Sequence, residues 1–500
     1  MKGRRRSHLI GGAVIATLIG LGHLEARATT FPGGDEAILH VLNRLGYGAT
    51  LGDVERVRAT GLQHYIEQQL RPDRIPDDGM AARLSGLTTL NLGARAITSE
   101  YELPQLEARR ERRAASKNGD AAADEQPKPP NPLQQKVNRL VVELSEQKIL
   151  RAVYSERQLQ EVLVDFWFNH FNVDARKGRV RFLLTEYERD RIRPHVLGRF
   201  RDLLEATATS PAMLFYLDNW MSADPNGPHS GTAWSPFPPR VPGGFGGGFS
   251  QPSLQHAQGQ GNKAPRGLNE NYGRELMELH TLGVDGGYTQ TDVTEVARAF
   301  TGWTIAPPRL GGGFRYDSRI HDPGRKIVLG HVINAGGGES DGQQVLDILA
   351  SHPATARFIA TKLVRRFVSD APPSALVARV ADRFRETGGD LRDVMRTLLA
   401  SPEFLAQDAY AVKTKTPFEF VVSALRATST VVDDPMPLVR TLQQLGMPPY
   451  MCQPPTGYQD TADAWVNTGA LVGRMNFALQ LARNDQDMAL RIGSPEFQRR

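Results

Sequence analysis

Apolar residues recur along most of this chain every three or four positions, which is the spacing of one face of an α-helix. Four stripes show it: Val137, Leu140, Val141 and Leu144; Leu159, Val162, Leu163 and Phe166; Val293, Val296, Ala297 and Phe300; and Ala356, Ile359, Leu363 and Phe367. Residues 314–330 have an extended pattern instead, around a turn-forming His321-Asp-Pro-Gly324 segment. The pattern predicts a mainly α, multi-helix globular fold with one small β-hairpin near 314–330.

A central helix is predicted over residues 269–282, because Gly283 provides a helix stop. At about 100° per residue, Glu275 and Glu278 share one side of this helix, and His280 points almost to the opposite side. The adjoining stripe, which we expect to face the core, consists of Tyr272, Leu276, Leu279 and Gly283. The geometry therefore rejects a metal site made of the two glutamates and His280.

Two stretches interrupt the helical pattern. Residues 104–132 carry arginines, then small polar residues, then prolines, a composition with little apolar surface to bury. We predict a solvated loop or linker there, and we favour it over a nucleic-acid patch because acids lie between the arginines. Residues 221–267 are rich in Gly, Pro and Ser without periodicity, which predicts a long insertion that is either flexible or a functional lid.

The first 28 residues have the organisation of a secretory signal peptide. Lys2, Arg4, Arg5 and Arg6 precede the apolar residues 9–21, and Ala26-Arg27-Ala28 fits a small-x-small cleavage site. The apolar stretch is short for a membrane span, so we predict cleavage, which leaves a helical domain at 29–500 without a transmembrane segment. This mature domain is predicted to be periplasmic or secreted. His8 stands where a twin-arginine signal prefers an apolar residue, so Sec export is favoured over Tat export.

The signal peptide also accounts for the basic charge of the chain. It holds five basic residues and one acid, so its removal lowers the formal net charge from +5 to about +1. A nearly neutral mature protein gives no electrostatic reason to expect a nucleic-acid partner. Cys452 is the single cysteine, which excludes an intramolecular disulfide; it is either a buried thiol or a site of pairing between chains.

Several short segments together identify a family. They are Arg44 within residues 40–48, Phe166-Trp-Phe-Asn-His-Phe171, the run from Asn269 to Gly283, Thr301-Gly-Trp303, His321-Asp322 with Lys326 and Leu329-Gly330, Pro455-Thr-Gly-Tyr458, and Asn467-Thr-Gly-Ala-Leu471 with Arg474-Met-Asn476. With these segments in this order over about residues 36–483, the chain resembles the DUF1800 family. The resemblance implies an exported bacterial protein, often encoded beside another exported protein that is a candidate partner. It implies no established activity and leaves any cofactor unknown.

Glu275 and Glu278 are the first candidates for chemistry. Two carboxylates one turn apart beside a buried stripe can do general acid–base work, or can bind a cation together with other oxygen ligands. The same residues can also tie helices together, with Arg274 expected to pair with Glu278 one turn later. We favour this structural reading, because ion-pair networks recruit the same residue types.

His170, His321 and Asp322 are the other candidates. His170 continues an apolar stripe between aromatic residues, a position typical of a core histidine held by one hydrogen bond. Asp174 lies one turn later if the helix continues, and it can then orient the imidazole. His321 and Asp322 lie in a predicted turn, where functional side chains are commonly displayed. Convergence of these residues with the glutamate pair would create a hydrolytic or metal site.

Familiar catalytic motifs are absent from the sequence. There is no His-Glu-x-x-His zinc helix, no Gly-x-Ser-x-Gly nucleophile elbow, no Walker A loop and no Cys-x-x-Cys-His haem motif. Two functional hypotheses therefore stay open. We favour an exported helical scaffold or envelope-assembly partner; the alternative is an exported hydrolase or metal-assisted enzyme that uses the glutamate pair with His170 and His321.

Export makes a direct prediction about the mature N-terminus. Cleavage after Ala28 leaves Thr29 as the first residue of a protein found in the periplasm or the medium. N-terminal sequencing of the protein recovered from separated cell fractions measures this. Recovery from the cytoplasm with Met1 intact would contradict the prediction.

Overall fold

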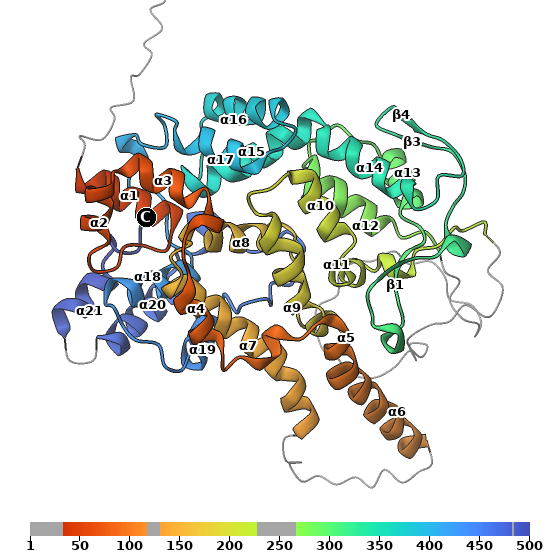
Figure 1. The fold of residues 1–500 in the computed structure, drawn as a ribbon, viewed down its shortest axis with the longest axis horizontal. Coiled ribbons are helices and arrows are strands. Elements are labelled where there is room, and N and C mark those ends of the chain that lie inside the picture. The colour runs from red at the N-terminus through yellow and green to blue at the C-terminus, as the bar shows by residue number, and fades with distance from the viewer. Residues whose placement is uncertain (1–33, 118–130, 228–266, 483–484) are drawn as a thin grey trace, which may run out of the picture.

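The computed structural model describes residues 34–117, 131–227, 267–482 and 485–500, and these residues are predominantly helical (Figure 1). Their strands form two separate two-stranded antiparallel sheets. The mainly α fold class predicted from the sequence is therefore confirmed. The predicted signal peptide lies outside the described residues, as does most of the Gly/Pro-rich insertion at 221–267. None of the described helices is both long enough and apolar enough to traverse a bilayer.

The described chain begins with three short helices that pack against one another: α1 (Asp35–Leu45), α2 (Asp53–Thr60) and α3 (Leu62–Gln69). The next helix, α4 (Asp78–Leu84), packs on α7 (Pro132–Tyr154) instead. The apolar side of α1 buries Leu42 and Leu45. The same helix buries Arg44, which donates to the carbonyl groups of Val368 and Ala409 at 3.2 and 2.8 Å. This contact joins the N-terminal helices to a part of the chain more than 300 residues away.

The arginine-rich segment differs from its prediction. The structure has here α5 (Ala94–Ile97), a π-helical turn (Thr98–Glu102) and α6 (Leu103–Lys117), which projects from the lower edge of the molecule in Figure 1. Arginine, glutamate and alanine are strong helix formers, so a segment with little to bury still forms a helix instead of a loop. The base of α6 is fixed by a buried ion pair, in which Arg179 donates to Glu102 at 2.5 and 2.9 Å. Residues 118–130 of the predicted linker lie outside the described residues.

Two longer helices, α7 (Pro132–Tyr154) and α8 (Gln158–His170), lie near the centre of the molecule (Figure 1). Shorter elements follow: α9 (Leu184–Glu186), a π-helical turn (Tyr187–Ile192), α10 (Phe200–Ala208) and α11 (Pro211–Tyr216). The end of α8 is held by Trp167, whose indole donates to the Val196 carbonyl at 3.2 Å. The Tyr187 hydroxyl donates to the Phe171 carbonyl at 2.7 Å. These contacts fix the position of the last turn of α8 in the core.

The strands belong to two hairpins rather than to one. The chain forms α12 (Glu270–Glu275), a π-helical turn (Leu276–Thr281), α13 (Gln290–Ala299), β1 (Trp303–Ile305), β2 (Phe314–Tyr316), β3 (Lys326–Val328) and β4 (His331–Ile333). Strand β1 pairs with β2, and β3 pairs with β4. The two strands predicted around residues 321–324 therefore exist as β2 and β3, but they do not pair with each other. The intervening segment contains a 3-10 turn (Ser318–Ile320) and is too long for a tight hairpin turn.

The C-terminal part is again helical. Its helices are α14 (Ser340–Ser351), α15 (Pro353–Phe367), α16 (Ser374–Glu386), α17 (Leu391–Leu399), α18 (Pro417–Ala427), α19 (Met436–Gln444), α20 (Thr468–Leu481) and α21 (Gln486–Gly493). Helix α16 packs on both α15 and α17, and α20 packs on α21. Thr416 and Glu419 form a complete capping box at the start of α18: the Thr416 side chain accepts from the Glu419 amide, and the Glu419 side chain accepts from the Thr416 amide. One continuous apolar core includes residues from α1 to α21.

Close packing of α14 on a tryptophan gives a test of this fold. A Cβ added at Gly342 would lie 2.5 Å from Cζ2 of Trp303, whose side chain is fully buried. Since overpacking a core forces side chains and backbone to shift, we predict that Gly342→Ala lowers the free energy of unfolding by about 1 to 3 kcal/mol. Denaturant unfolding measures the change.

Gly79→Ala is the matched control for this substitution. Gly79 also lies in a helix, α4, but no atom lies within 4 Å of the position of an added Cβ. Alanine in a helix is more stable than glycine by about 0.5 to 1 kcal/mol, so this variant should gain stability. A destabilisation that is equal for the two variants would contradict the close approach of α14 to Trp303.

Candidate functional site

Three polar side chains at the end of α8 bind parts of the chain that are far away in the sequence. They are Asn169 and His170 in the last turn of α8 and Asn172 directly after it, and they lie next to Trp167 and Phe171, which are buried in the core. Polar groups that are removed from water need hydrogen-bond partners inside the protein. Each of these three side chains finds its partner in a segment far away in the sequence, so the end of α8 is where several parts of the chain meet.

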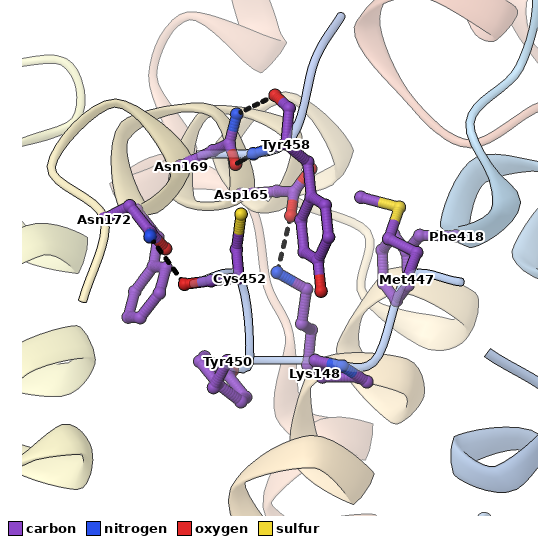
Figure 2. A pocket seen from close by; sticks show the side chains of 11 residues that line it. Lys148, Asp165, Asn169, Asn172, Phe418, Met447, Tyr450, Cys452 and Tyr458 are labelled. Carbon is purple, nitrogen blue, oxygen red and sulfur yellow. Dashed lines mark hydrogen bonds and ion pairs between the residues drawn. The ribbon is translucent and has the colours of Figure 1, made fainter. Parts of the chain in front are cut away.

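Asn169 holds the loop that contains the Pro455-Thr-Gly-Tyr458 segment (Figure 2). Its Nδ2 donates to the Tyr458 carbonyl at 2.8 Å, and its Oδ1 accepts from the Tyr458 amide at 2.7 Å. The side-chain amide thus pairs with the backbone as a neighbouring strand would. Gly457 makes this approach possible, because an added Cβ would lie 2.3 Å from the Asn169 carbonyl oxygen and the glycine has a φ of 74°.

Asn172 holds the preceding part of the same loop. Its Nδ2 donates to the carbonyl groups of Cys452 and Pro454 at 2.9 and 2.8 Å. Cys452 is buried, and burial raises the pKa of its thiol to about 12. A protonated, enclosed thiol is a poor nucleophile and does not reach another chain. Of the two alternatives for Cys452 that the sequence leaves open, the structure has the buried thiol.

A small cavity lies between α8 and this loop (Figure 2). Its lining includes Lys148, Asp165, Asn169, Phe418, Tyr450 and Cys452. Lys148 and Asp165 form an ion pair with an Nζ–Oδ1 distance of 2.5 Å. The volume is about 30 Å³, which is room for about one or two water molecules and not for an organic substrate. The cavity therefore gives no support to an active site at this position.

His170 lies in the core with a defined hydrogen-bond pattern. Lys362 donates to its Nδ1 over 2.9 Å, so Nε2 carries the ring hydrogen and donates to the His280 carbonyl at 3.1 Å. Burial, and then the charge of Lys362, lowers the pKa of His170 well below its ordinary value, so the ring stays neutral. The prediction that Asp174 orients this imidazole is wrong. Because α8 ends at His170, Asp174 no longer shares its helix face and instead pairs with Arg176 at 3.0 Å.

Lys362 and His280 are the partners that the sequence analysis missed. Burial lowers the pKa of Lys362 to about 8 and that of His280 to about 3. Lys362 follows Ile359 of the buried stripe of α15 by three positions, and this helical spacing was the available signal. The Nε2 atom of His280 is buried without a hydrogen-bond partner among the described residues. Together with His170, these side chains form a polar group that joins α8, α15 and the central helix.

The central helix changes its geometry between the two glutamates. Glu275 ends the α-helical part, and Glu278 lies in the π-helical turn that follows. In this turn, the Leu282 amide donates to the Met277 carbonyl five residues earlier, at 2.7 Å. A π turn changes the angular spacing of side chains relative to an α-helix, and such turns are frequent at functional sites. The regular spacing assumed from the sequence therefore applies only to the first half of this helix.

The predicted pair between Arg274 and Glu278 is wrong. Arg274 donates to the side-chain carbonyl of Gln290 at 2.6 Å, and the Tyr288 hydroxyl donates to Glu278 at 3.1 Å. Glu275 is half-buried and accepts no hydrogen bond from the described residues. Burial, and then the negative charge of Glu278, raises the pKa of Glu275 to about 6, and Arg274 opposes this shift.

His321 and Asp322 are buried, although the sequence predicts their display in a turn. The Nε2 atom of His321 lies 3.2 Å from Asp341, and Lys326 donates to the same Asp341 oxygen at 2.7 Å. Arg298 binds both carboxylate oxygens of Asp322, at 2.7 and 3.1 Å. The cluster ties α13, β3 and α14 together. Removal of one partner from a buried pair of this kind costs about 3 to 5 kcal/mol, so these residues have a structural explanation.

The candidates proposed from the sequence do not form one site. Each group has its own partners, and among the described residues no hydrogen bond or ion pair joins His170, His321 and the glutamate pair to one another. His280 is buried while Glu275 and Glu278 remain half-buried, so the predicted separation of His280 from the glutamates holds. The predicted buried stripe is wrong at Leu279, which is half-buried, because the π turn shifts the second half of this helix. Within the described part of the chain, no three side chains of His, Cys, Asp or Glu come together as potential metal ligands.

Comparison with known families shows where the chain belongs. The family described as "Protein of unknown function (DUF1800)" matches residues 40–498. The chain belongs to the DUF1800 family. The match includes the range of about 36–483 that the short segments indicated, apart from its first few residues. No curated protein and no solved structure matches the chain.

Several of the segments that indicate DUF1800 contact distant parts of the chain in the structure. Asn169 from the aromatic segment of α8 holds Tyr458 from the Pro-Thr-Gly-Tyr segment, and Arg44 anchors α1 to the C-terminal half. Arg474 from the last segment donates to the Lys415 carbonyl at 2.8 Å. These DUF1800 segments therefore connect distant parts of the fold.

Glu275→Gln is predicted to stabilise this DUF1800 protein above pH 6. The folded pKa of about 6 lies above the ordinary value of 4.5, so the folded protein binds this proton more tightly than the unfolded chain does. The stability that this group contributes is fully present below pH 4.5 and is lost as the pH rises through 6. A neutral glutamine avoids the loss, and we expect it to raise the free energy of unfolding by about 1 kcal/mol at pH 8 after allowance for solvent screening.

Urea unfolding at pH 8 and at pH 4.5 measures this effect, since the gain should vanish at the lower pH. Glu100→Gln is the control, because Glu100 is exposed and the substitution removes the same charge. A gain of equal size at both pH values, or a loss at pH 8, would contradict the idea that an ionised Glu275 destabilises the fold.

Proposed function

We propose that this DUF1800 protein is an exported helical scaffold or assembly partner of the bacterial envelope, and that it docks through helix α20. The observation that carries the proposal is an apolar face of α20 that the other described segments leave largely exposed. The predicted signal peptide supports export. The candidate partner is an exported protein encoded nearby, as the family resemblance implies.

Helix α20 is apolar on two sides. One side packs into the body through Phe477 and Ala478. The other side is the α20 apolar face, which consists of Leu471, Val472, Met475 and Leu479, exposed to 40, 55, 38 and 53%. At about 100° per residue these four side chains cover an arc of about 100°, the width of a stripe that normally faces a core. Contiguous exposed apolar side chains of this kind commonly mark a protein–protein contact, so a partner is expected to cover this face.

The surroundings of this face suit docking. Val466 and Leu490 add exposed apolar surface before α20 and on α21, with exposed fractions of 49 and 65%. The only charged residue of α20 is Arg474, which is fully buried and leaves the face uncharged. The helix is capped by Asn467, which accepts from the Ala470 amide at 2.9 Å, and Arg474 ties it to the body through the Lys415 carbonyl at 2.8 Å. A helix face that is already formed before binding lowers the ordering cost of docking.

The partners of the candidate catalytic residues also support a non-catalytic role. His170, His321 and Asp322 are at most 6% exposed and make the contacts that hold helices and strands together. Chemistry on a substrate requires contact with it, and these side chains are enclosed by protein. Only Glu275 and Glu278 remain half-buried.

An exported hydrolase or metal-assisted enzyme is the second candidate. The observation that favours it is the half-buried Glu275 beside Glu278: burial, and then the charge of Glu278, raises the pKa of Glu275 to about 6, where a carboxyl can act as a general acid or base near neutral pH. In this alternative, His170 and His321 would contribute only after a rearrangement that exposes them.

Charge placed on the α20 apolar face tests the docking proposal. We predict that Val472→Glu and Leu479→Glu, each combined with co-expression of the exported protein encoded nearby, reduce its co-purification at least about tenfold, because each buries an unpaired charge at the interface. The melting temperature should stay nearly unchanged, since both side chains are about half exposed without the partner. Gln480→Glu is the matched control: it adds the same charge to the exposed polar side of the same helix and should leave binding intact.

Two results would overturn the docking proposal. One is full retention of the partner by Val472→Glu and Leu479→Glu, and the other is an equal loss caused by Gln480→Glu.

Complementation of a deletion strain distinguishes the enzyme hypothesis from the scaffold hypothesis. The hydrolase becomes the better hypothesis if Glu275→Gln or Glu278→Gln abolishes complementation while the variant still binds the partner and its melting temperature does not fall.

A further inference from the structure

The interior beside α18 and α20 contains a concentration of positive charge that we name the basic cluster. Its members are Arg44, Arg366, Lys413, Lys415, Arg474 and Arg500, and none of them is more than 4% exposed. They come from α1, α15, α20 and two segments that pair through their backbones: the Lys413 amide donates to the Arg500 carbonyl at 3.2 Å, and the Arg500 amide donates to the Lys413 carbonyl at 2.8 Å. The cluster therefore joins both ends of the described chain.

Three acidic side chains face this cluster. Glu419 is buried and pairs with Arg366 and, at 3.1 Å, with Arg500. Burial raises the pKa of Glu419, but Arg366 and Arg500 outweigh this effect and hold it at about 2. Asp370 accepts from Lys413 at 2.5 Å. Asp460 lies 3.6 Å from Arg366 and 3.5 Å from Lys413.

Positive charge therefore exceeds negative charge by three among these described side chains. Asp165, a further acid that acts on Arg366, is itself paired with Lys148 at 2.5 Å and does not reduce the excess. Unpaired charge in an interior of low dielectric constant is strongly unfavourable. The fold must relieve this excess, either by releasing a proton from a lysine or by binding an anion.

Unsatisfied donors distinguish these two solutions. Nε and Nη1 of Arg44, Nε and Nη2 of Arg366, and Nε of both Arg474 and Arg500 are buried without a hydrogen-bond partner among the described residues. Burial lowers the pKa of Lys415 to about 7, so its deprotonation removes one charge. Deprotonation leaves all the guanidinium donors unsatisfied, whereas an anion with several acceptor oxygens relieves the charge and accepts their hydrogen bonds.

We propose that the basic cluster binds one small inorganic oxyanion of the phosphate or sulfate class through the guanidinium groups of Arg44, Arg366 and Arg500. Arg500 donates to the Arg366 carbonyl at 3.3 Å, which places these two side chains together. Arg44 donates to the carbonyl of Val368, two residues beyond Arg366, at 3.2 Å, which places its guanidinium beside the same part of the chain. Burial, and then the charge of Arg500, lowers the pKa of Arg44. Guanidinium forks match the oxygens of such anions, and the near-complete burial of the cluster selects an ion over a larger ligand.

The bound ion stabilises the attachment of α20. Arg474 of α20 belongs to the same cluster and donates to the Lys415 carbonyl, so an ion that offsets the positive charge of the cluster also favours the burial of the residue that holds this helix. The anion site stands without the docking proposal, because it depends on buried side chains and not on the exposed face of α20.

Thermal unfolding of the purified mature protein tests the site. After dialysis against chloride, the protein is melted in sodium phosphate, sodium sulfate and sodium chloride at equal pH and ionic strength, which removes general screening as a cause. We expect a saturable rise of the melting temperature with phosphate or sulfate that chloride does not give, because a ligand of the folded state stabilises it. The oxyanion that raises the melting temperature, phosphate or sulfate, is the one that the site binds. Ion chromatography of freshly purified, unfolded protein should release about one equivalent of the same ion per chain.

Two variants assign the effect to the cluster. Arg366→Lys keeps the charge but removes the guanidinium fork, and Arg44→Met keeps the length of the stem but removes the donors; each should weaken the ion's apparent affinity at least about tenfold. Arg392→Met is the control, because Arg392 also donates to a backbone carbonyl, that of Leu70 at 2.9 Å, outside the cluster. If Arg44→Met does not fold, Arg366→Lys and the stoichiometry decide the question.

The proposal is overturned by equal melting temperatures in all three salts together with release of no oxyanion. A response that persists unchanged in Arg366→Lys also overturns it, because the ion then binds elsewhere. In either case, proton release from Lys415 becomes the way in which the fold tolerates its excess of charge.

Discussion

The loop at residues 448–458 packs against α8. Its backbone N–H and C=O groups are not part of a helix or a strand, so they need other hydrogen-bond partners. Asn169 and Asn172 provide them, with further support from Ala175, whose amide donates to the Tyr450 carbonyl at 2.9 Å. The same end of α8 delivers His170 to Lys362 and to the central helix. The position of α15, of the central helix and of this loop therefore depends on one helix terminus.

Local information explains why so much of the helical fold could be predicted. The stripe spacing of α8, α13 and α15, the capping box of α18 and the glycine at residue 283 each depend on residues within a few positions of one another. Strand pairing depends on which turn closes a hairpin. Strands β2 and β3 were predicted as strands but were assigned to each other across residues 321–324, whereas β3 turns at Leu329-Gly330 to pair with β4, and β2 pairs with β1, which precedes the predicted region. Helix α6 was missed for another reason: its composition lacks an apolar stripe, while its residues have high intrinsic helix propensity.

In the candidate site, too, local spacing predicted the positions of side chains but not the distant partners that they contact. The sequence located His170 on a buried stripe and separated His280 from the glutamates, because both follow from helix geometry. It assigned Asp174 to His170 and Arg274 to Glu278 by proximity along the chain, whereas the fold supplies Lys362 and Tyr288. A partner that is nearly 200 residues away leaves no local signal, and a π turn cancels the regular spacing on which the second pairing rested.

Buried charge connects the interior of this protein to its exposed apolar surface. Arg474 belongs to the basic cluster and also anchors α20, so the helix whose outer face is free is attached through a part of the core that carries excess positive charge. Whatever neutralises that charge also strengthens the attachment, because repulsion among Arg44, Arg366 and Arg500 opposes the packing on which α20 rests. The attachment of the α20 apolar face to the body therefore depends on the electrostatic state of the core beneath it.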